Sequence, residues 1–466
     1  MNFNINSKCK TGLIVLISLG LLGCTKVNDT KINDTTAPEG KVVSSFDDEL
    51  TKPVNATAAD KQWNVKSETE NNENDSQEFD SQKDMNAESE GQVDLSEETG
   101  NQRDLKAEND SNIDENAETD TTVVDIIMVG DILLHTPIEE CSELENGEYD
   151  YMPIFEDMSE EISKADLALV NEEVIIGGKD LGVSGYPAFN ASFELSDALE
   201  AAGFDVICHA TNHALDKGKK GILNTLENWD KHPNVDVIGI YDSEAEAENI
   251  YITEVEGIKL AILNYTYGTN GIAVPEDMPY CVNLLEETKL IEDIKKAEAL
   301  ADFTIVCPHW GTEYRLEPDS MQDKWTKLFY ENGVDLVLGT HPHVIEPYEM
   351  YGDGDRQMLV YYSLGNFVNW TSGTGEGVAN RMLGGMAKVS LSKSVETGEV
   401  SISDYGVEAI VCHLENDEGT RNVAVVPLRE YDMEKSLKNA IRLQDENFDY
   451  DYMINLCNLI WSNGWE

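Results

Sequence analysis

Residues 125–131 read DIIMVGD, an aliphatic run that ends in Gly130 and Asp131. Runs of this kind are typical of buried strands. Three later apolar runs, at residues 205–209, 304–307 and 335–338, are also followed at once by polar side chains. In open α/β sheets, ligands bind beyond the carboxyl ends of the strands, so loops from distant segments can meet in one crevice. The pattern predicts an α/β fold whose strand ends build a single site.

The polar residues after these runs are of the types that bind metal ions. They stand in four short stretches: Gly130-Asp131, Asn212-His213, His309-Trp310-Gly311 and His341-Pro342-His343. Carboxylate, amide and imidazole ligands suit divalent Mn, Fe or Zn, and one carboxylate can bridge two such ions. A lone histidine is more often structural than a ligand, but histidines at several strand ends beside Asp, Asn and Glu favour a site. The sequence therefore predicts a centre with two divalent metal ions.

Helical spacing and strand-like runs alternate through the rest of the folded region. Amphipathic helices are predicted at residues 221–229 and 320–332, with Gly333 as a C-terminal cap of the second. Beyond Phe367, three apolar runs read as strands that we expect to complete a second sheet, at residues 387–391, 407–412 and 423–426. Closing helices are expected at residues 433–444 and 453–461. The prediction is an α/β sandwich of four layers, two β-sheets flanked by helices.

The amino terminus resembles the signal of a bacterial lipoprotein. Lys8 and Lys10 precede an apolar run at residues 13–22, which ends in the lipobox-like sequence Leu21-Leu22-Gly23-Cys24. The run is too short to span a bilayer comfortably. We expect a signal peptide at residues 1–23, lipidation of Cys24, and an extracytoplasmic lipoprotein held to the cell membrane. An uncleaved signal anchor is the alternative.

The segment that follows Cys24 has the composition of a solvated spacer. Residues 25–120 contain 26 acidic and 9 basic residues and few aromatics. Such a segment cannot bury enough apolar surface to offset its ordering entropy, so we expect residues 24–120 to be a lipidated cysteine followed by a disordered acidic tether. The folded part would then be residues 121–430, with residues 431–466 as a helical closure of the same domain.

The overall charge limits the classes of partner. The chain has 90 acidic and 33 Lys and Arg residues, a formal net charge of −57. We do not expect the protein to bind nucleic acid, because neutralising the phosphates needs a basic face. A polyanionic substrate would also be repelled unless bound cations bridged it. The cysteines show no Cys-x-x-Cys spacing, and those in strand-like runs are expected to be buried reduced thiols.

Taken together, the motifs resemble the CapA/PgsA family of bacterial capsule and poly-γ-glutamate synthesis proteins, which is similar to calcineurin-like metallophosphoesterases. The matching residues run in the family's order: Gly130-Asp131 to His135, Asn171 to Glu173, Asn212-His213 with Asp216 and Gly218, His309-Trp310-Gly311 with Glu313-Tyr314, Gln322, Gly339 to His343, and residues 362–367. The resemblance implies a metallophosphoesterase-like fold. It covers roughly half of the chain, and its motifs together are highly specific.

The resemblance also implies roles for individual residues. The implied metal ligands are Asp131, Glu173, Asn212, His309, His341 and His343. His213 would be a general acid that protonates a leaving group. Further candidate ligands or pocket residues are His135, Asn171, Glu172, Asp216, Glu313 and Asn366.

This chain departs from the phosphoesterase pattern at two places. The first histidine is displaced to His135, which would share a face with Asp131 if the chain turned into a helix after Gly130. The bridging position falls on Asn171-Glu172-Glu173, where the family usually has a leucine between the asparagine and the glutamate. Which carboxylate bridges, and whether both metal positions are filled, is therefore open at the level of sequence.

Several other residues have structural interpretations. His209 lies within a strand pattern and is expected to be a core imidazole, whereas His232 and His413 are expected in solvent or turns. The glycine-rich residues 373–385 read as a flexible loop near the mouth of the site and a candidate lid. Trp310 and Tyr314 either stack on a substrate or pack the loop.

Three functions follow from these observations. The leading interpretation is an envelope-anchored CapA-family lipoprotein in capsule or poly-γ-glutamate synthesis or export, which retains a metallophosphoesterase-like metal site. Its partners would be the membrane, poly-γ-glutamate and membrane synthesis or export proteins. The alternatives are an active metal-dependent phosphoesterase or hydrolase on an envelope substrate, and a non-catalytic polymer-binding or scaffold component.

Overall fold

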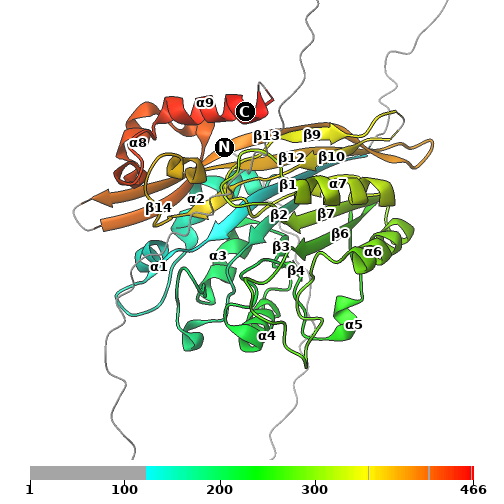
Figure 1. The fold of residues 1–466 in the computed structure, drawn as a ribbon, viewed down its shortest axis with the longest axis horizontal. Coiled ribbons are helices and arrows are strands. Elements are labelled where there is room, and N and C mark those ends of the chain that lie inside the picture. The colour runs from blue at the N-terminus through cyan, green and yellow to red at the C-terminus, as the bar shows by residue number, and fades with distance from the viewer. Residues whose placement is uncertain (1–121, 355, 418–419, 463, 466) are drawn as a thin grey trace, which may run out of the picture. The chain divides into compact units, whose positions relative to one another are not determined.

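The computed structural model describes residues 122–354, 356–417, 420–462 and 464–465. The predicted signal peptide, Cys24 and the acidic tether lie outside these residues and stay predictions. Figure 1 shows the fold, with two β-sheets and helices on their outer sides. Within the described part, no helix combines the length and apolarity needed to cross a membrane.

The first sheet contains the amino-terminal strand of the folded region. Its strands run in the order β14 (Thr420–Pro427), β13 (Val400–Asp417), β12 (Leu383–Lys393), β1 (Thr122–Leu133), β2 (Leu167–Glu172), β3 (Val206–Cys208) and β4 (Asp236–Ile238). A short strand, β11 (Asn366–Asn369), pairs in parallel with the end of β1. Strands β1 to β4 are parallel to one another, whereas β12, β13 and β14 are antiparallel to their neighbours.

The second sheet has a parallel centre and antiparallel edges. Its order is β5 (Tyr251–Val255), β6 (Ile258–Thr266), β7 (Phe303–His309), β8 (Leu336–Leu338), β10 (Met358–Tyr361) and β9 (Tyr348–Tyr351). Side chains alternate between its two faces, as the period of a strand requires. Leu260 and Ile262 join the core shared with the first sheet, whereas Ala261 and Leu263 join a separate cluster with the helices outside.

Helices flank both sheets, which confirms the predicted fold class. Beside the first sheet lie α1 (Thr136–Ser142), α2 (Met152–Ile162) and α3 (Glu194–Ala202). Over the second lie α6 (Glu287–Leu300) and α7 (Ser320–Asn332), whose apolar residues fill the outer cluster. The remaining helical segments are α4 (Gly218–Trp229), α5 (Glu244–Ala247), α8 (Met433–Lys438), α9 (Tyr450–Trp461), η1 (Lys179–Leu181), η2 (Val378–Met382), η3 (Leu428–Glu430) and η4 (Ala440–Leu443).

The helix predictions are confirmed with one change. Helix α7 has the predicted bounds, begins at a capping box of Asp319 and Gln322, and ends at Gly333 with φ of 116°. The single helix expected at residues 433–444 is instead α8 followed by η4. The break falls at Asn439, whose side chain accepts a hydrogen bond from the Ile441 N–H and so starts a new turn.

One prediction about the strands was wrong. Strands β12 to β14 do not complete the second sheet but extend the first. The parallel strands β2 to β4 follow one edge of β1, so its other edge is open and pairs with β12. Strand β1 also continues to Leu133, since β11 pairs with its end. Asp131 and His135 therefore do not share a helix face, and His135 is the N-cap residue of α1.

The structure also corrects the expected setting of two histidines and of the glycine-rich loop. His232 is buried, because it packs on Trp229 and its Nδ1 lies 2.7 Å from Glu200 Oε2. His413 lies in β13 and is half-buried against Tyr431. Only part of residues 373–385 is a loop, since η2 and the start of β12 occupy residues 378–385.

Candidate metal centre

The predicted ligands converge at the carboxyl ends of parallel strands in both sheets. Asp131 lies near the end of β1, and Glu173 directly follows β2. Asn212 and His213 lie in the loop after β3. In the second sheet, His309 is the last residue of β7, and His341 and His343 lie in the loop after β8. All seven side chains are buried.

Glycines let the backbone segments around these residues approach closely. A Cβ on Gly130 would lie 1.9 Å from the Gly365 carbonyl oxygen, and a Cβ on Gly339 would lie 2.1 Å from that of Tyr362. No side chain fits at such distances. The Asp131 N–H can therefore donate to the Gly365 carbonyl at 2.9 Å, which fixes Asp131 against β11.

Glu173 lies between two groups of ligand atoms. The ligand atoms of Glu173, His309 and His341 lie within 4.8 Å of one another, and so do those of Asp131, Glu173 and His343. Glu173 Oε1 is 3.6 Å from His309 Nε2, and its Oε2 is 3.7 Å from His343 Nδ1. One carboxylate thus presents a separate oxygen to each group, which is the arrangement of a bridging ligand.

The donor set fits divalent metal ions. Both oxygens of Glu173 and the Nδ1 of His341 are buried without a hydrogen-bond partner among the described residues. Buried carboxylate and imidazole atoms are costly to leave unpaired, and they are ligand types suited to Mn, Fe and Zn. His341 and His343 also hold positive φ values of 103° and 59°, which non-glycine residues keep only where the surroundings fix them.

The charges of the centre depend on one another. Burial would raise the pKa of Glu173, but the nearby charges of His343 and His309 outweigh it and hold that pKa below its ordinary value. Burial, with the charge of Glu173, raises the pKa of Asp131. Burial would lower the pKa of His343, but Glu173 and Asp131 raise it to about 9. The pKa of His341 is lowered well below its ordinary value by burial and by the neighbouring imidazoles.

Hydrogen bonds fix the orientation of Asp131. Its Oδ1 accepts from Asn171 Nδ2 at 2.8 Å, and its Oδ2 accepts from the backbone N–H of His341 at 3.2 Å. Oδ2 is also 3.1 Å from His343 Nδ1, which has a second partner in Asn366 Oδ1 at 3.1 Å. Asn171 and Asn366 therefore lie at the centre and hold its ligands.

Neighbours also orient His309. Its Nδ1 lies 3.1 Å from Thr340 Oγ1, and its Nε2 lies 2.9 Å from Asn212 Oδ1. Asn171 Nδ2 also lies 3.3 Å from Nδ1, and Nε2 faces the oxygens of Asn212 and Glu173. Such outer partners orient the ring of a metal-binding histidine.

His213 and Asp216 form a pair at the edge of the centre. His213 Nδ1 lies 2.7 Å from Asp216 Oδ2, and its Nε2 faces Glu173 Oε1 at 4.0 Å. Asp216 is itself fixed, since it accepts from the Phe189 N–H at 2.7 Å. The Phe189 ring packs edge-on against His213 with centroids 4.7 Å apart. The imidazole is thus held with one nitrogen on a carboxylate and the other toward the ligands.

Of the remaining candidates, Glu172, His135 and Glu313 also lie outside the two ligand groups. Glu172 is buried, and its Oε1 accepts from the Val174 N–H, so Glu173 alone is shared by the groups. His135 packs on Phe189 at 5.3 Å, and burial lowers its pKa to about 4. Glu313 is exposed. His209 is a buried core imidazole as predicted, and its Nε2 accepts from the Trp229 indole.

Two residues beside the centre were missed by the sequence reasoning. The Tyr267 ring lies 4.6 Å from that of His341, and Asn270 contacts both Asn212 and His213. Both follow β6, so the strand-end rule used for the other segments could have found them. Trp310 is buried and donates to the Tyr362 carbonyl, so it packs the core, whereas Tyr314 is 46% exposed.

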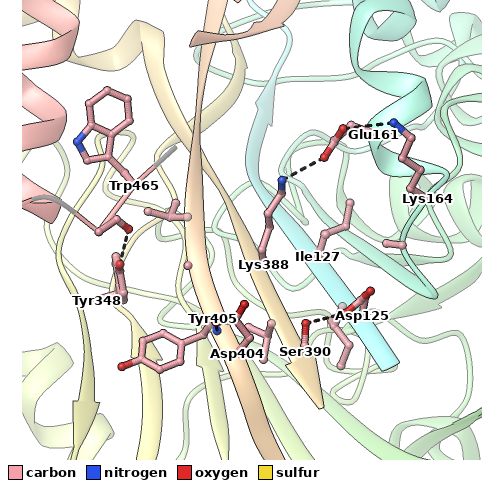
Figure 2. Close-up of a pocket in the computed structure, with 16 residues that line it drawn as sticks. Asp125, Ile127, Glu161, Lys164, Tyr348, Lys388, Ser390, Asp404, Tyr405 and Trp465 are labelled. Atoms are coloured by element: carbon pink, nitrogen blue, oxygen red, sulfur yellow. Dashed lines mark hydrogen bonds and ion pairs between the residues drawn. The ribbon is translucent and has the colours of Figure 1, made fainter. Parts of the chain in front are cut away.

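A large cavity lies away from this centre. It has a volume of about 650 Å³ and is lined by residues of the first half of β1, by β12 and by β13. Figure 2 shows Lys388, Glu161 and Asp125 at its wall. It contains none of the predicted site residues. The predicted site residues lie instead at the opposite ends of the strands.

The fold and the buried cluster define an α/β protein with a candidate metal centre at the strand ends of two sheets. The family model of the bacterial capsule synthesis protein PGA_cap matches residues 125–371. The chain belongs to this family, which confirms the resemblance seen in the sequence. The matched residues include both ligand groups.

Curated relatives carry related names. The capsule biosynthesis protein CapA of Bacillus anthracis is 29% identical over 261 residues, which cover 52% of this chain and 60% of that protein. The PGA biosynthesis protein CapA of Bacillus subtilis (strain 168) is 34% identical over 178 residues, covering 37% of this chain and 45% of that protein. The matches thus span about half the length of these relatives.

Similar solved structures are more distant. The calcineurin-like phosphoesterase YfkN of Bacillus subtilis is 14% identical with a TM-score of 0.36, covering 62% of this chain and 90% of that one. A phosphatase of Mycoplasma pneumoniae is 17% identical with a TM-score of 0.36, covering 62% of this chain and 94% of that one.

Proposed function

We propose that this protein acts in capsule or poly-γ-glutamate synthesis or export at the cell envelope, and that its centre is a dinuclear metal site able to hydrolyse a phosphoester. The family assignment and the names of the two CapA relatives support the first part. The partners would be poly-γ-glutamate and the membrane proteins that make or export it. Lipidation of Cys24 would hold the protein to the outer face of the membrane.

The position of Glu173 carries the metal proposal. Glu173, His309 and His341 would hold one ion, with Asn212 beside them, and Asp131, Glu173 and His343 would hold the other. Two bound divalent ions would supply Lewis acidity and an activated water for attack on a phosphoryl group. The amide groups of Asn171 and Asn366 orient Asp131 and His343 within this set.

The surroundings of His213 support a role in proton transfer. Asp216 holds Nδ1 at 2.7 Å, so Nε2 is the nitrogen directed at the centre. In its protonated form, His213 would donate the Nε2 proton to a leaving oxygen, and the carboxylate of Asp216 would stabilise the imidazolium. A positioned general acid of this kind accelerates a reaction roughly 10²- to 10⁴-fold.

The test is hydrolysis by the purified chain. Wild type, His341→Ala and His413→Gln are loaded with Mn, Fe or Zn and assayed on p-nitrophenyl phosphate and bis(p-nitrophenyl) phosphate. Metal-dependent turnover that is lost in His341→Ala but kept in His413→Gln, a histidine outside the centre, is the expected result. Bound metal without turnover on either ester would contradict hydrolysis and favour a non-catalytic polymer-binding role.

A further inference from the structure

Arg381 is a half-buried cation beside the centre that has no ion pair with any described residue. It follows the glycine-rich loop, in η2. Its Nη1 donates to Thr371 Oγ1 at 2.8 Å, and its guanidinium carbon lies 3.5 Å from the centroid of the Tyr314 ring. Its Nε is buried without a hydrogen-bond partner among the described residues. Thr371 accepts from Nη1, whereas Nη2 has no hydrogen-bond partner among the described residues and is not buried, so this end of the guanidinium is left for a ligand.

Three other described arginines, Arg315, Arg356 and Arg442, also lack an ion pair with a described residue, so what sets Arg381 apart is its position beside the centre. Acidic residues outnumber Lys and Arg by 90 to 33, so a carboxylate partner is easy to supply. Some cations of the fold do have one: Arg421 pairs with Glu140, and Lys388 pairs with Glu161 and Glu408. No described carboxylate oxygen lies within 4.0 Å of the Arg381 guanidinium. The charge of Glu313 acts on Arg381 only from beyond this distance, so the half-buried guanidinium can still bind an anion.

Arg381 is tied to the metal-binding loop by two routes. Its carbonyl oxygen accepts from Asn366 Nδ2 at 2.9 Å, and Asn366 Oδ1 is 3.1 Å from His343 Nδ1. On the other side, the Tyr314 N–H donates to the Pro342 carbonyl at 2.7 Å, and the Tyr314 ring lies 6.0 Å from that of His343. Both Arg381 and the ring beneath it are therefore positioned by the segment that carries His341 and His343.

We infer that Arg381 binds an oxyanion of the substrate, a phosphoryl or carboxylate group, while the substrate lies at the metal centre. The inference rests on the proposed function, since it places that substrate. A guanidinium edge makes two parallel hydrogen bonds to such a group, and stacking on Tyr314 holds its plane. In a chain of charge −57, this residue supplies the local attraction that a substrate anion needs.

Binding to simple anions tests this role without relying on turnover. The full chain is loaded with metal, and the affinities for inorganic phosphate and for glutarate are measured by calorimetry for wild type, Arg381→Gln, Arg381→Lys and Arg421→Gln. Arg421 is the matched control, because it also lies over an aromatic ring, that of Trp370, and carries the same charge. Metal content is measured in each sample.

The affinity for at least one anion should fall roughly ten-fold or more in Arg381→Gln, as expected for loss of a charge-assisted hydrogen bond. Arg381→Lys should lose less, and Arg421→Gln should match wild type. A loss for phosphate alone identifies a phosphoryl group, and a loss for glutarate alone identifies a carboxylate. Unchanged affinities in Arg381→Gln at equal metal content, or no binding of either anion by wild type, would overturn the inference.

The two proposals fail in different ways. If no phosphoester is hydrolysed but Arg381→Gln still weakens anion binding, the hydrolase assignment fails and the role of Arg381 stands. If hydrolysis is found but Arg381→Gln binds both anions as tightly as wild type does, the hydrolase assignment stands and the role of Arg381 fails.

Discussion

Glu173 Oε1 lies 3.6 Å from His309 Nε2, although the two residues come from different sheets and stand far apart in the chain. The other oxygen of Glu173 faces His343. Both oxygens are buried, and neither accepts a hydrogen bond from the described residues. A buried carboxylate without hydrogen bonds depends on counter-charges, which the neighbouring imidazoles provide and bound metal ions would add to.

The pair of His213 and Asp216 leads to a first prediction. Asp216→Asn should lower metal-dependent phosphoester turnover roughly ten- to hundred-fold, because the amide no longer stabilises a protonated His213. Metal content should stay at the wild-type value, since Asp216 belongs to neither ligand group. Turnover is measured beside elemental analysis.

The chain offers a matched control for this variant. His232 Nδ1 lies 2.7 Å from Glu200 Oε2, the same distance as in the His213 pair, but outside the centre. Glu200→Gln should leave turnover unchanged. Equal losses in the two variants would show that the effect of Asp216→Asn is not specific to the centre.

A second prediction concerns the close approach of β1 and β11. Gly130→Ala should destabilise the fold by roughly 2 kcal/mol or more, because its Cβ would lie 1.9 Å from the Gly365 oxygen and force the strands apart. Displacement of Asp131 should also reduce metal binding. Chemical denaturation and elemental analysis check both effects.

Gly406→Ala is the control for this change. Gly406 lies in β13 of the same sheet, and its Cβ would meet no atom within 4 Å. The control should change stability by less than about 0.5 kcal/mol. A Gly130→Ala protein as stable as this control would contradict the packing described for the strand end.

A third prediction concerns the pH dependence of stability. Burial raises the pKa of Glu139 to about 8 from an ordinary value of 4.5. Between these values the folded state holds a proton that the unfolded state has lost, so stability is full below pH 4.5 and falls as pH rises toward 8. Glu139→Gln removes this loss and can still accept the hydrogen bond of Tyr151.

The free energy of unfolding of Glu139→Gln should therefore exceed that of wild type by roughly 1–3 kcal/mol at pH 8, with little difference at pH 4.5. Denaturant titrations at the two pH values measure it. The exposed neighbour Glu143 provides the control, Glu143→Gln. A gain in Glu139→Gln that is the same at both pH values would rule out protonation of Glu139 as its cause.

Much of this architecture could be predicted from the sequence. Apolar runs followed by polar residues correctly located the ends of β1, β3, β7 and β8. These ends do meet: the His341 N–H donates to Asp131, which lies 210 positions earlier in the chain. The rule works because parallel strands of an α/β sheet present their carboxyl ends at one edge. It also covers β6, where Tyr267 was overlooked.

Other features depend on three-dimensional pairing that the sequence does not encode locally. Glu172 and Glu173 are adjacent and chemically alike, but successive side chains at a strand end point to opposite sides, so only one reaches the ligands. The pairing of β12 with β1 could not be predicted either, because an apolar run indicates a buried strand but does not show which strand it pairs with.

The most direct test of the dinuclear centre is the metal content of the purified full chain as wild type, Glu173→Gln and Glu172→Gln, after incubation with Mn, Fe or Zn and removal of free ions. Burial raises the pKa of Glu172 well above its ordinary value, so its neutral amide is a close mimic. We predict about two ions per chain in wild type and Glu172→Gln, and a loss of most bound metal in Glu173→Gln. Wild type without metal, or Glu173→Gln with as much metal as wild type, would contradict a centre bridged by Glu173.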